Sequence, residues 1–456
     1  MAKVKPTIPK GTRDFTPEIM VKRDYIFDTI KTIFRKYAYH PLETPSMENI
    51  STLTGKYGEE GDKLLFRILN SGDYFSKVTD EELNEKSLNT ITPKISNKGL
   101  RYDLTVPFAR FVVQHRNEIT FPFKRYQIQP VWRADKPQKG RYREFYQCDV
   151  DVIGSDGLLN EVELIKIMDE VFTALDLKVT IKMNNRKILK GLAEYLNSPD
   201  KFMDITMAID KLDKIGIEKV KQELSDRGID KDGVQRIEPF LKLEGSNTER
   251  REKLANMLSQ IEEAENGILE TEEILDLLTS LELNNNVEFD PKLARGLDYY
   301  TGTIFEVKAE EIEIGSICGG GRYDDLAGVF GLKDVSGVGI SFGAERIFDV
   351  MEKLEKFPSQ MIPSAKVLFV NFGKEETKHA LKLAEKIRSK GIKAELYPDT
   401  AKMKKQFTYA DNLGIRYVAI IGEHEMKENL ITLKDMETGE QTEHTPESFI
   451  DLLLVK

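Results

Sequence analysis

The segment RYREFYQCDVDV, residues 141–152, alternates polar and apolar side chains along much of its length. In an extended strand such alternation sorts side chains onto two faces. One face would carry Phe145, Gln147, Asp149 and Asp151, and the other Tyr146, Cys148, Val150 and Val152. The second face is apolar and is expected to pack on a core. The polar face could bind an ammonium group and stack against a flat ring. The alternative is that this face is simply exposed to solvent.

An earlier segment, LRYDLTVP at residues 100–107, is expected to form a strand of the same kind. Its Arg101, Asp103 and Thr105 would share one face. A carboxylate with a hydroxyl two residues on would help to bind the cationic end of an amino acid, whereas an exposed edge strand has a similar pattern. The period-two pattern extends to Gly154 and predicts half-buried antiparallel strands.

Around these strands, a chain of 456 residues is expected to form two or three domains. Helical spacing predicts an amphipathic helix over 17–37 and a charge-rich helical stretch over 175–286. Strand patterning returns at 297–307 and 337–342. Beyond residue 363, strands at 367–372, 393–397 and 417–421 alternate with helices at 375–390 and 402–413, which predicts a mostly parallel βαβαβ sheet.

The predicted fold class is therefore α+β, with a central antiparallel sheet, a helical insertion and a C-terminal α/β three-layer domain. The first part of the main domain is assigned to residues 1–174 and its second part to 291–360. The insertion is assigned to 175–290, and the C-terminal domain to 364–456.

Composition narrows the class of protein. The net charge of −10 argues against a general nucleic-acid binder, but Lys124 to Arg143 is a basic stretch that can hold a polyanion locally. Two cysteines without a CxxC pair, and five histidines without ligand spacing, make a disulfide framework and a protein-bound metal improbable. No apolar run is long enough to span a membrane, and no secretory signal is recognised. A cytoplasmic protein is expected, with neither a membrane nor DNA as partner.

Three separated arginines are candidate phosphate ligands. Arg133 follows Val131–Trp132 at a strand end, where a fixed guanidinium can grip a phosphate through two hydrogen bonds. Arg346 lies in the first turn of a helix that begins after Gly343, where free N–H groups favour phosphate. Arg295 opens RGLDYYTG, residues 295–302, before a strand expected to begin with two tyrosines. Exposed arginines and structural tyrosines are the alternatives.

A glycine-rich segment could allow a ligand to lie close to the backbone. Residues 318–324, CGGGRYD, let the backbone come near a ligand because glycine has no Cβ, but they lack the Lys-Ser/Thr end of a P-loop. Gly337, Gly339 and Gly343 do not fit a dinucleotide-binding fingerprint, since its sixth position is Phe342. Three arginines, an aromatic ring and a carboxylate-rich pocket, without an activated nucleophile, are typical of phosphoryl or nucleotidyl transfer.

The motifs, taken in order, resemble the histidine-specific class II aminoacyl-tRNA synthetases over nearly the whole chain. The opening PKGTRD at 9–14 and the stretch 39–48 with Pro45 resemble the family's start and its dimer-forming first motif. Residues 133–147 resemble the second class II motif and 343–346 the third. RGLDYY at 295–300 and GGRY at 320–323 resemble the histidine signatures.

The resemblance implies a class II synthetase fold, ATP and Mg²⁺ as cofactors, L-histidine and tRNA(His) as partners, and a homodimer. Catalysis would fall to Arg133, Arg295 and Arg346, with no metal-ligating side chains. ATP would be bound by Arg133, Asp135, Arg141, Arg143, Phe145 and Arg346. Histidine would be bound by Asp103, Thr105, Gln147, Asp151, Tyr299, Tyr300, Gly320 and Tyr323. Gln138 would meet the tRNA acceptor end, and the C-terminal domain resembles the family's anticodon-binding module.

One departure is Asp135, where many members of the family have glutamate, so adenine contacts can differ in detail. Two other functions compete. A non-catalytic paralogue, similar to the regulatory subunit of ATP phosphoribosyltransferase, would usually lose the phosphate arginines and the C-terminal domain, both of which are present here. An RNA-binding module built on the C-terminal domain alone would leave the three arginines and the tyrosine pair unexplained.

Overall fold

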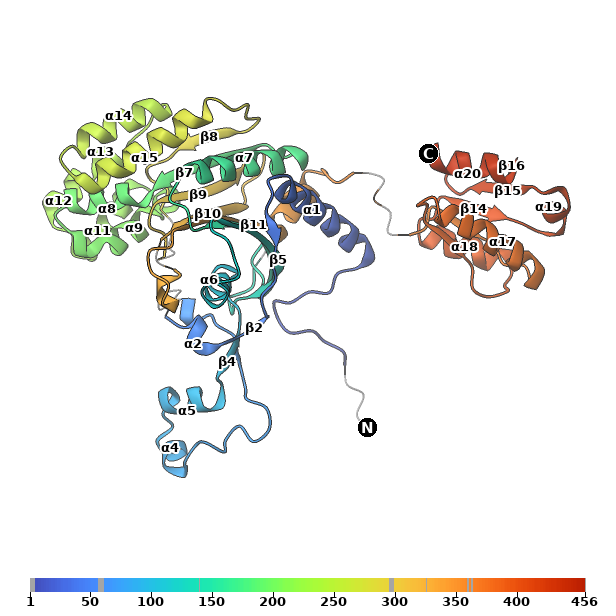
Figure 1. Ribbon diagram of the computed structural model, residues 1–456, viewed down its shortest axis with the longest axis horizontal. Coiled ribbons are helices and arrows are strands. Elements are labelled where there is room, and N and C mark those ends of the chain that lie inside the picture. Colours follow the sequence, from blue (N-terminus) through green and yellow to red (C-terminus); the bar gives the residue numbers. More distant parts are fainter. Residues whose placement is uncertain are drawn as a thin grey trace. The chain divides into compact units, whose positions relative to one another are not determined.

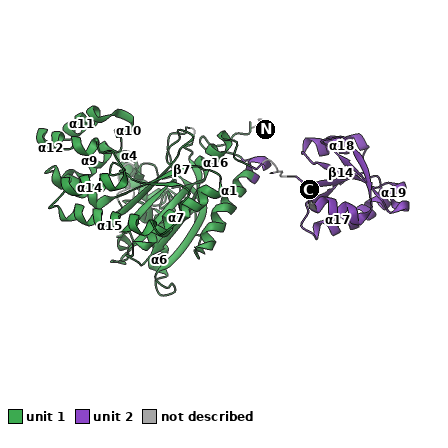
Figure 2. Cartoon of the chain, turned by 90° about the horizontal axis from the view of Figure 1, so that it is seen from above, with its two compact units in different colours: residues 1–14, 22–357 green, residues 15–21, 358–456 purple. Residues whose placement is uncertain are grey.

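The computed structural model describes residues 5–55, 61–138, 140–294, 299–324, 326–358, 361 and 364–455. The chain divides into two compact units, one of residues 1–14 and 22–357 and one of residues 15–21 and 358–456 (Figure 2). No helix within these ranges is both long and apolar enough to cross a bilayer.

A sheet of eight strands organises the larger unit (Figure 1). Its order is β1-β5-β6-β11-β10-β9-β7-β8, and every neighbouring pair from β5 to β7 is antiparallel. The edge strands β1 and β8 run parallel to β5 and β7. The strands are β1 (His40–Pro41), β5 (Phe123–Trp132), β6 (Glu144–Ile153), β7 (Val179–Asn185), β8 (Asn286–Phe289), β9 (Thr303–Ala309), β10 (Cys318–Tyr323) and β11 (Gly337–Gly343). The central antiparallel sheet is thus confirmed.

Three helices pack against one face of this sheet. They are α1 (Pro17–Lys36), α7 (Leu159–Ala174) and α16 (Ala344–Lys353). Their apolar side chains, such as Ile30, Phe172 and Ile347, form one core with Cys148, Val150 and Val152 of β6. The alternation predicted for β6 is therefore confirmed. Burying this face leaves the Phe145–Asp151 side of β6 directed to the other side of the sheet.

The segment 100–107 was predicted incorrectly as a strand. The structure has β4 (Lys98–Leu100), a short connection, and then α6 (Thr105–Gln114). Val106, Phe108, Ala109 and Val112 of α6 are buried, so helical spacing of apolar residues, and not alternation, governs this stretch. β4 joins β2 (Met47–Asn49) and β3 (Arg67–Ile68) in a small sheet accompanied by α2 (Ile50–Leu53), α4 (Asp80–Glu85) and α5 (Leu88–Ile95).

The helical stretch begins later than predicted. Residues 179–185 form β7 and belong to the large sheet, because Ile181 and Met183 complete the sheet's core. The helices are α8 (Arg186–Tyr195), η1 (Pro199–Lys201), α9 (Phe202–Ile209), α10 (Leu212–Ile215), α11 (Ile217–Asp226), α12 (Lys231–Arg236), α13 (Glu238–Leu241), α14 (Asn247–Met257) and α15 (Glu262–Leu278). They enclose a separate core that includes Leu192, Phe240 and Ile268.

The smaller unit contains the predicted βαβαβ order. β12 (Val367–Phe369) pairs in parallel with both β13 (Ala394–Leu396) and β14 (Tyr417–Ile420), and the intervening helices are α17 (Lys374–Arg388) and α18 (Met403–Asn412). Two antiparallel strands that were not predicted extend the sheet, β15 (Ile431–Asp435) and β16 (Gln441–His444). Helices α19 (Glu423–Glu428) and α20 (Pro446–Val455) also belong to this unit, whereas η2 (Gly328–Phe330) belongs to the larger one.

Candidate active site

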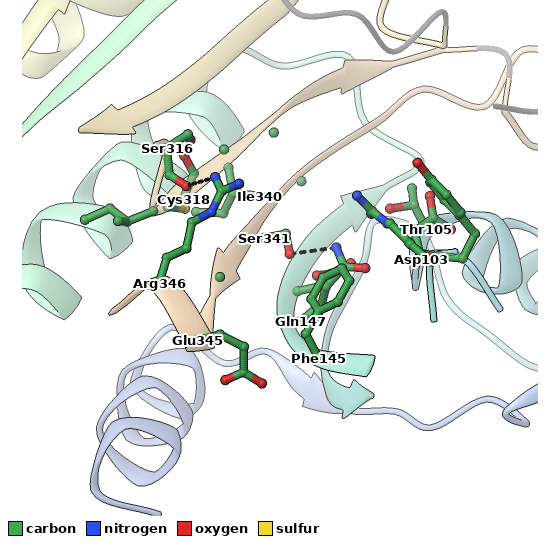
Figure 3. Close-up of a pocket in the computed structure, with 18 of the residues that line it drawn as sticks. Asp103, Thr105, Phe145, Gln147, Ser316, Cys318, Ile340, Ser341, Glu345 and Arg346 are labelled. Atoms are coloured by element: carbon green, nitrogen blue, oxygen red, sulfur yellow. Dashed lines mark hydrogen bonds between the residues drawn. The ribbon is translucent and has the colours of Figure 1, made fainter. Parts of the chain in front are cut away.

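A cavity of about 230 Å³ lies on the polar face of β6 (Figure 3). It brings together most of the predicted site residues, although they come from distant parts of the chain. The predicted residues that line it are Asp103, Thr105, Arg133, Asp135, Arg141, Phe145, Gln147, Asp151, Tyr299, Tyr300, Gly320, Tyr323 and Arg346. Arg133 and Arg346 therefore face one cavity, as a site for a single polyanion requires.

The floor of the cavity is built by alternate residues of β6. Gln147, Asp149 and Asp151 lie opposite Gly343, Ser341 and Gly339 of β11 in the strand register. The amide Nε2 of Gln147 donates to Ser341 Oγ at 3.0 Å. The hydroxyl of Tyr323 donates to Asp151 Oδ1 at 2.7 Å. Figure 3 shows Gln147 and Phe145 on the same side of β6.

A buried arginine of the neighbouring strand offsets the charge of the two aspartates. Arg125 Nη2 lies 2.9 Å from Asp151 Oδ2 and 3.9 Å from Asp149 Oδ2, and none of the arginine is exposed. Burial is the main cause that raises the pKa of Asp149 to about 7; Asp151 acts in the same direction, whereas Arg125 and a hydrogen bond from Ser341 lower it. Burial also raises the pKa of Asp151, opposed by Arg125 and by the hydrogen bond from Tyr323. The floor is thus poor in donors and rich in carboxylate oxygens.

Arg133 stands at the end of β5, as predicted. Its Nε donates to the carbonyl of Tyr102 at 3.0 Å, which fixes the plane of the guanidinium. The group lies 4.2 Å from the centre of the Tyr102 ring and 5.2 Å from that of Phe145. A guanidinium held over aromatic faces loses little freedom when it binds a phosphate. Phe145 thus offers a flat surface beside a cation, as a nucleotide base and its phosphates would need.

Arg346 reaches the cavity from the first turn of α16 (Figure 3). Its Nη1 donates to the carbonyl of Ser316 at 2.6 Å and its Nε to that of Gly140 at 3.3 Å. These bonds tie the helix to the loop before β10 and to the loop after Arg133. The N–H groups at the start of a helix favour an anion nearby, so helix and side chain contribute to one positive edge.

Tyr102, Asp103 and Thr105 line the cavity at the start of α6. Asp103 Oδ1 accepts a hydrogen bond from the backbone N–H of Val106 at 3.1 Å, which is the bond expected at a helix N-terminus. Asp103 and Thr105 thus line the site because they lie at the start of a helix, and not because a strand alternates as predicted. The carboxylate lies on the same side of the cavity as Thr105 and away from Arg346 in Figure 3.

The tyrosine pair precedes a strand and does not open it. β9 begins at Thr303, so Tyr299 and Tyr300 lie in the preceding turn and connection; the predicted strand over 297–307 is wrong at residues 299–302, and residues 297–298 lie outside the described residues. Their ring centroids are 4.8 Å apart, and the ring of Tyr299 meets that of Tyr323 edge-on at 6.4 Å. The three rings form an aromatic wall next to the aspartates.

Some predicted residues are not brought to the cavity. Arg143 is not among the residues that line it, and its Nε and Nη1 donate to the backbone carbonyls of Asp135 and Lys10. Gln138 forms a backbone bridge with Arg141 in the loop outside the cavity. Arg295 lies outside the described residues.

Other residues of the site were not predicted from the sequence. Asp149 was placed on the correct face of β6 but not assigned to the site, and Ser341 follows from the register of β11 alone. Glu345 lines the cavity and forms a two-pronged ion pair with Arg23 of α1, at 2.6 and 3.2 Å. Arg125 gave no local signal, since its role depends on pairing between β5 and β6.

Gly320 is required by the packing of the sheet. A Cβ at this position would lie 2.0 Å from the carbonyl oxygen of Gly339, which is backbone of the neighbouring strand. Gly320→Ala is therefore expected to lower the free energy of unfolding by about 1–3 kcal/mol, the usual cost of overpacking. Urea denaturation would measure this change. At Gly343 a Cβ would meet only an ordinary contact at 3.5 Å, so Gly343→Ala is the control, and equal stability of the two variants would contradict the packing argument.

Comparisons with known proteins agree with this geometry. The family model described as histidyl-tRNA synthetase matches residues 11–347, and that described as anticodon binding domain matches residues 366–456. A histidine–tRNA ligase of Bacteroides fragilis (strain YCH46) is 58% identical over 98% of this chain and 99% of its own length. One of Porphyromonas gingivalis (strain W83) is 55% identical over 96% of both chains.

Solved structures give the same result. The crystal structure of histidyl-tRNA synthetase from Nostoc sp. PCC 7120 superposes with a TM-score of 0.82 at 31% identity, over 99% of this chain and 100% of that one. The fold, the cavity and the extent of these matches together show that the chain belongs to the histidyl-tRNA synthetase family.

Proposed function

We propose that the chain activates L-histidine with ATP to histidyl-adenylate and then transfers the histidyl group to the 3′ end of tRNA(His). One observation carries this proposal. A cavity with Arg133 and Arg346 at its walls also contains a carboxylate-rich floor and an aromatic wall. A triphosphate and a small cationic amino acid can be held side by side only where such groups converge. The family and its relatives support the same activity.

In the first step a carboxylate oxygen of histidine attacks the α-phosphorus of ATP, and the bond to pyrophosphate breaks. Arg133 would hold the α-phosphate and the histidine carboxylate, which brings two anions together and neutralises the charge that develops. Adenine would stack on Phe145, with Asp135 and Arg141 beside the nucleotide. Arg346 would cover the other side of adenine and meet the γ-phosphate. The resemblance assigns Arg143 to the phosphates and Arg295 to the α-phosphate.

Histidine itself would be held at the opposite end of the floor. Asp103, Thr105 and Gln147 would take the α-amino group, since an ammonium needs acceptor oxygens on several sides. Asp151, Tyr299, Tyr300 and Tyr323 would surround the imidazole, with Gly320 allowing close approach of the backbone. Burial, and then the Asp151 carboxylate, raise the pKa of Tyr323 well above its usual value. Its phenol therefore keeps its proton and orients Asp151.

Mg²⁺ is part of the proposal. Within the described ranges, no group of three or more His, Cys, Asp or Glu side chains is arranged to hold a metal ion. Of the two carboxylates that line the cavity near Arg133 and Arg346, Glu345 is paired with Arg23 and Asp135 lies 3.9 Å from Arg141. Mg²⁺ would therefore arrive with the phosphates of ATP, and no step here is assigned to it.

The second step would bring the tRNA acceptor end to the loop that contains Gln138, and the terminal ribose hydroxyl would displace AMP from the adenylate. Residues 364–456 would bind the anticodon, as the match to an anticodon binding domain supports. The proposed division assigns residues 1–174 and 291–360 to the catalytic domain and 175–290 to the insertion, except that β7 and β8 belong to the large sheet. The chain would form a homodimer and act in the cytoplasm.

Histidine-dependent exchange of radiolabelled pyrophosphate into ATP tests the function. The purified full chain is expected to catalyse this exchange with histidine and with none of the other nineteen standard amino acids. Charging of tRNA(His) with labelled histidine then tests the second step. A chain that binds histidine but gives no exchange would be a non-catalytic paralogue, and the proposed activity would be wrong.

A further inference from the structure

The two aspartates on the cavity floor are not equivalent. Asp151 Oδ1 accepts a hydrogen bond from the Tyr323 hydroxyl at 2.7 Å, and Oδ2 lies 2.9 Å from Arg125 Nη2 in an ion pair without hydrogen-bond geometry. The carboxylate is also packed against Gly339, where a Cβ would lie 2.0 Å from Oδ1. Asp151 is therefore fixed in place by the protein, and its capacity to meet a ligand is partly used.

Asp149 is held less firmly than Asp151, because Arg125 lies 3.9 Å from it and 2.9 Å from Asp151. The residue is 2% exposed and lines the cavity, and Oδ1 has no hydrogen-bond partner in the described parts of the chain, although a hydrogen bond from Ser341 lowers the pKa of the carboxyl group. Arg125 lies 3.9 Å from the other oxygen, Oδ2. A buried carboxylate oxygen without a donor costs free energy, and native structures rarely leave one without a purpose. A donor from a ligand would remove this cost.

The position of Asp149 indicates which ligand supplies that donor. Asp149 and Phe145 are four residues apart on one strand, which is about 13 Å at the usual rise per residue. A nucleotide base on Phe145 would therefore lie at the other end of the floor, and its phosphates cannot donate. Gln147, which lies between them, is assigned to the α-amino group. What remains next to Asp149 is the side chain of the amino acid.

We propose that Asp149 is a specificity-determining residue, whose Oδ1 accepts a hydrogen bond from an imidazole N–H of the substrate. This inference rests on the proposed function, because it assumes that histidine is the amino acid bound. Imidazole is a flat ring that carries an N–H group. The aromatic wall, which includes Tyr299 and Tyr323, occupies one side of the ring's position, so the N–H group would face the carboxylate of Asp149. An analogue whose ring lacks N–H would leave Asp149 Oδ1 buried and without a donor.

Arg125 acts in this scheme as a positioning residue. It is completely buried, and its guanidinium lies 4.3 Å from the centre of the Phe108 ring, so it cannot move toward solvent. One cation between two aspartates keeps both carboxylates on the floor and lowers their mutual repulsion. Arg125 touches neither the nucleotide nor the amino acid in this arrangement, and its effect reaches the substrate only through the two aspartates.

The test compares Asp149→Ala and Asp149→Asn with wild type in pyrophosphate exchange. Asp149→Ala is expected to raise KM for histidine roughly 10- to 100-fold, the range for a lost hydrogen bond to a charged group, and to leave KM for ATP within about twofold. Asp149→Asn keeps an acceptor oxygen, so its KM for histidine is expected to rise less than that of Asp149→Ala. The preference for histidine over thiazolylalanine, whose ring has no N–H, should fall at least ~10-fold in Asp149→Ala, because sites built around a hydrogen bond reject analogues that lack it.

Controls separate this role from a structural one. Asp169→Asn removes another buried carboxylate, on α7 and outside the cavity, where it accepts from the backbone of Asn284 and Asn285. This variant should lose stability and keep the wild-type preference between the two amino acids. Arg125→Lys retains the charge but not the planar fork, and it should raise KM for histidine with little change in KM for ATP.

The outcomes distinguish the inference from the proposed function. Wild-type exchange that depends on histidine, together with an unchanged preference in both Asp149 variants, would overturn the role of Asp149 alone. If Asp149→Ala does not fold, the preference measured for Asp149→Asn decides, and a value equal to that of wild type would count against the inference. Absence of histidine-dependent exchange in the wild type would instead overturn the proposed function.

Discussion

Arg133→Ala is expected to lower kcat/KM for histidine-dependent pyrophosphate exchange by about 10²–10³-fold, the usual cost of losing one preorganised donor to a transition state. The wild-type guanidinium is held in advance by the Tyr102 carbonyl and lies over the rings of Tyr102 and Phe145. Such a group needs no reorganisation when charge moves onto the phosphate oxygens. Its loss should therefore reduce kcat more than it raises KM for ATP.

Arg116→Ala is the matched control, since Arg116 is an exposed arginine outside the cavity. This variant should retain wild-type exchange. The melting temperature of Arg133→Ala should be measured in parallel to establish that the variant is folded. A folded Arg133→Ala variant with exchange within threefold of wild type would show that Arg133 does not contact the reacting phosphate.

A second large effect is expected for stability, at an ion pair behind the cavity. Arg322→Met should lower the free energy of unfolding of the larger unit by about 3–5 kcal/mol, because it leaves a buried carboxylate without its cation. Arg322 Nε and Nη2 donate to the two oxygens of Glu161 at 2.6 and 2.7 Å, and Glu161 is completely buried. Urea denaturation followed by fluorescence of Trp132, the single tryptophan, would measure the loss.

Two comparisons make this prediction specific. Arg322→Met combined with Glu161→Leu removes both charges and should restore much of the stability, since paired removal leaves no uncompensated charge. Lys36→Met breaks an exposed pair with Glu170 and should cost less than about 1 kcal/mol. Equal losses for Arg322→Met and Lys36→Met would contradict the view that burial makes the Arg322–Glu161 pair decisive.

Much of the site could be predicted because its floor is a single strand. The alternation from Phe145 to Asp151 is a local pattern, and the buried partners Cys148, Val150 and Val152 confirm its orientation. Arg133 at the end of β5 and Arg346 in the first turn of α16 were predicted from the local position of each residue in its element. Their convergence on one cavity was implied by the resemblance and is visible in the structure.

Other features depend on contacts that no local pattern records. Residues 100–107 alternate as a strand would, but the apolar side chains of α6 extend beyond Val106 and favour a helix once they are buried together. The residues of β7 were predicted to be part of a helical stretch. They form a strand because they pair with β9, which lies more than a hundred residues later in the chain. Arg125 and Asp149 meet only when β5 and β6 pair, so neither charge could be assigned a partner from the sequence.

A crystal structure of the full chain with L-histidine and a non-hydrolysable ATP analogue would test the central claim most directly. We expect adenine on Phe145, phosphate oxygens within hydrogen-bond distance of Arg133 and Arg346, and the imidazole beside Asp149 and Asp151. A triphosphate bound elsewhere, or a histidine ring that faces away from the β6 floor, would contradict it.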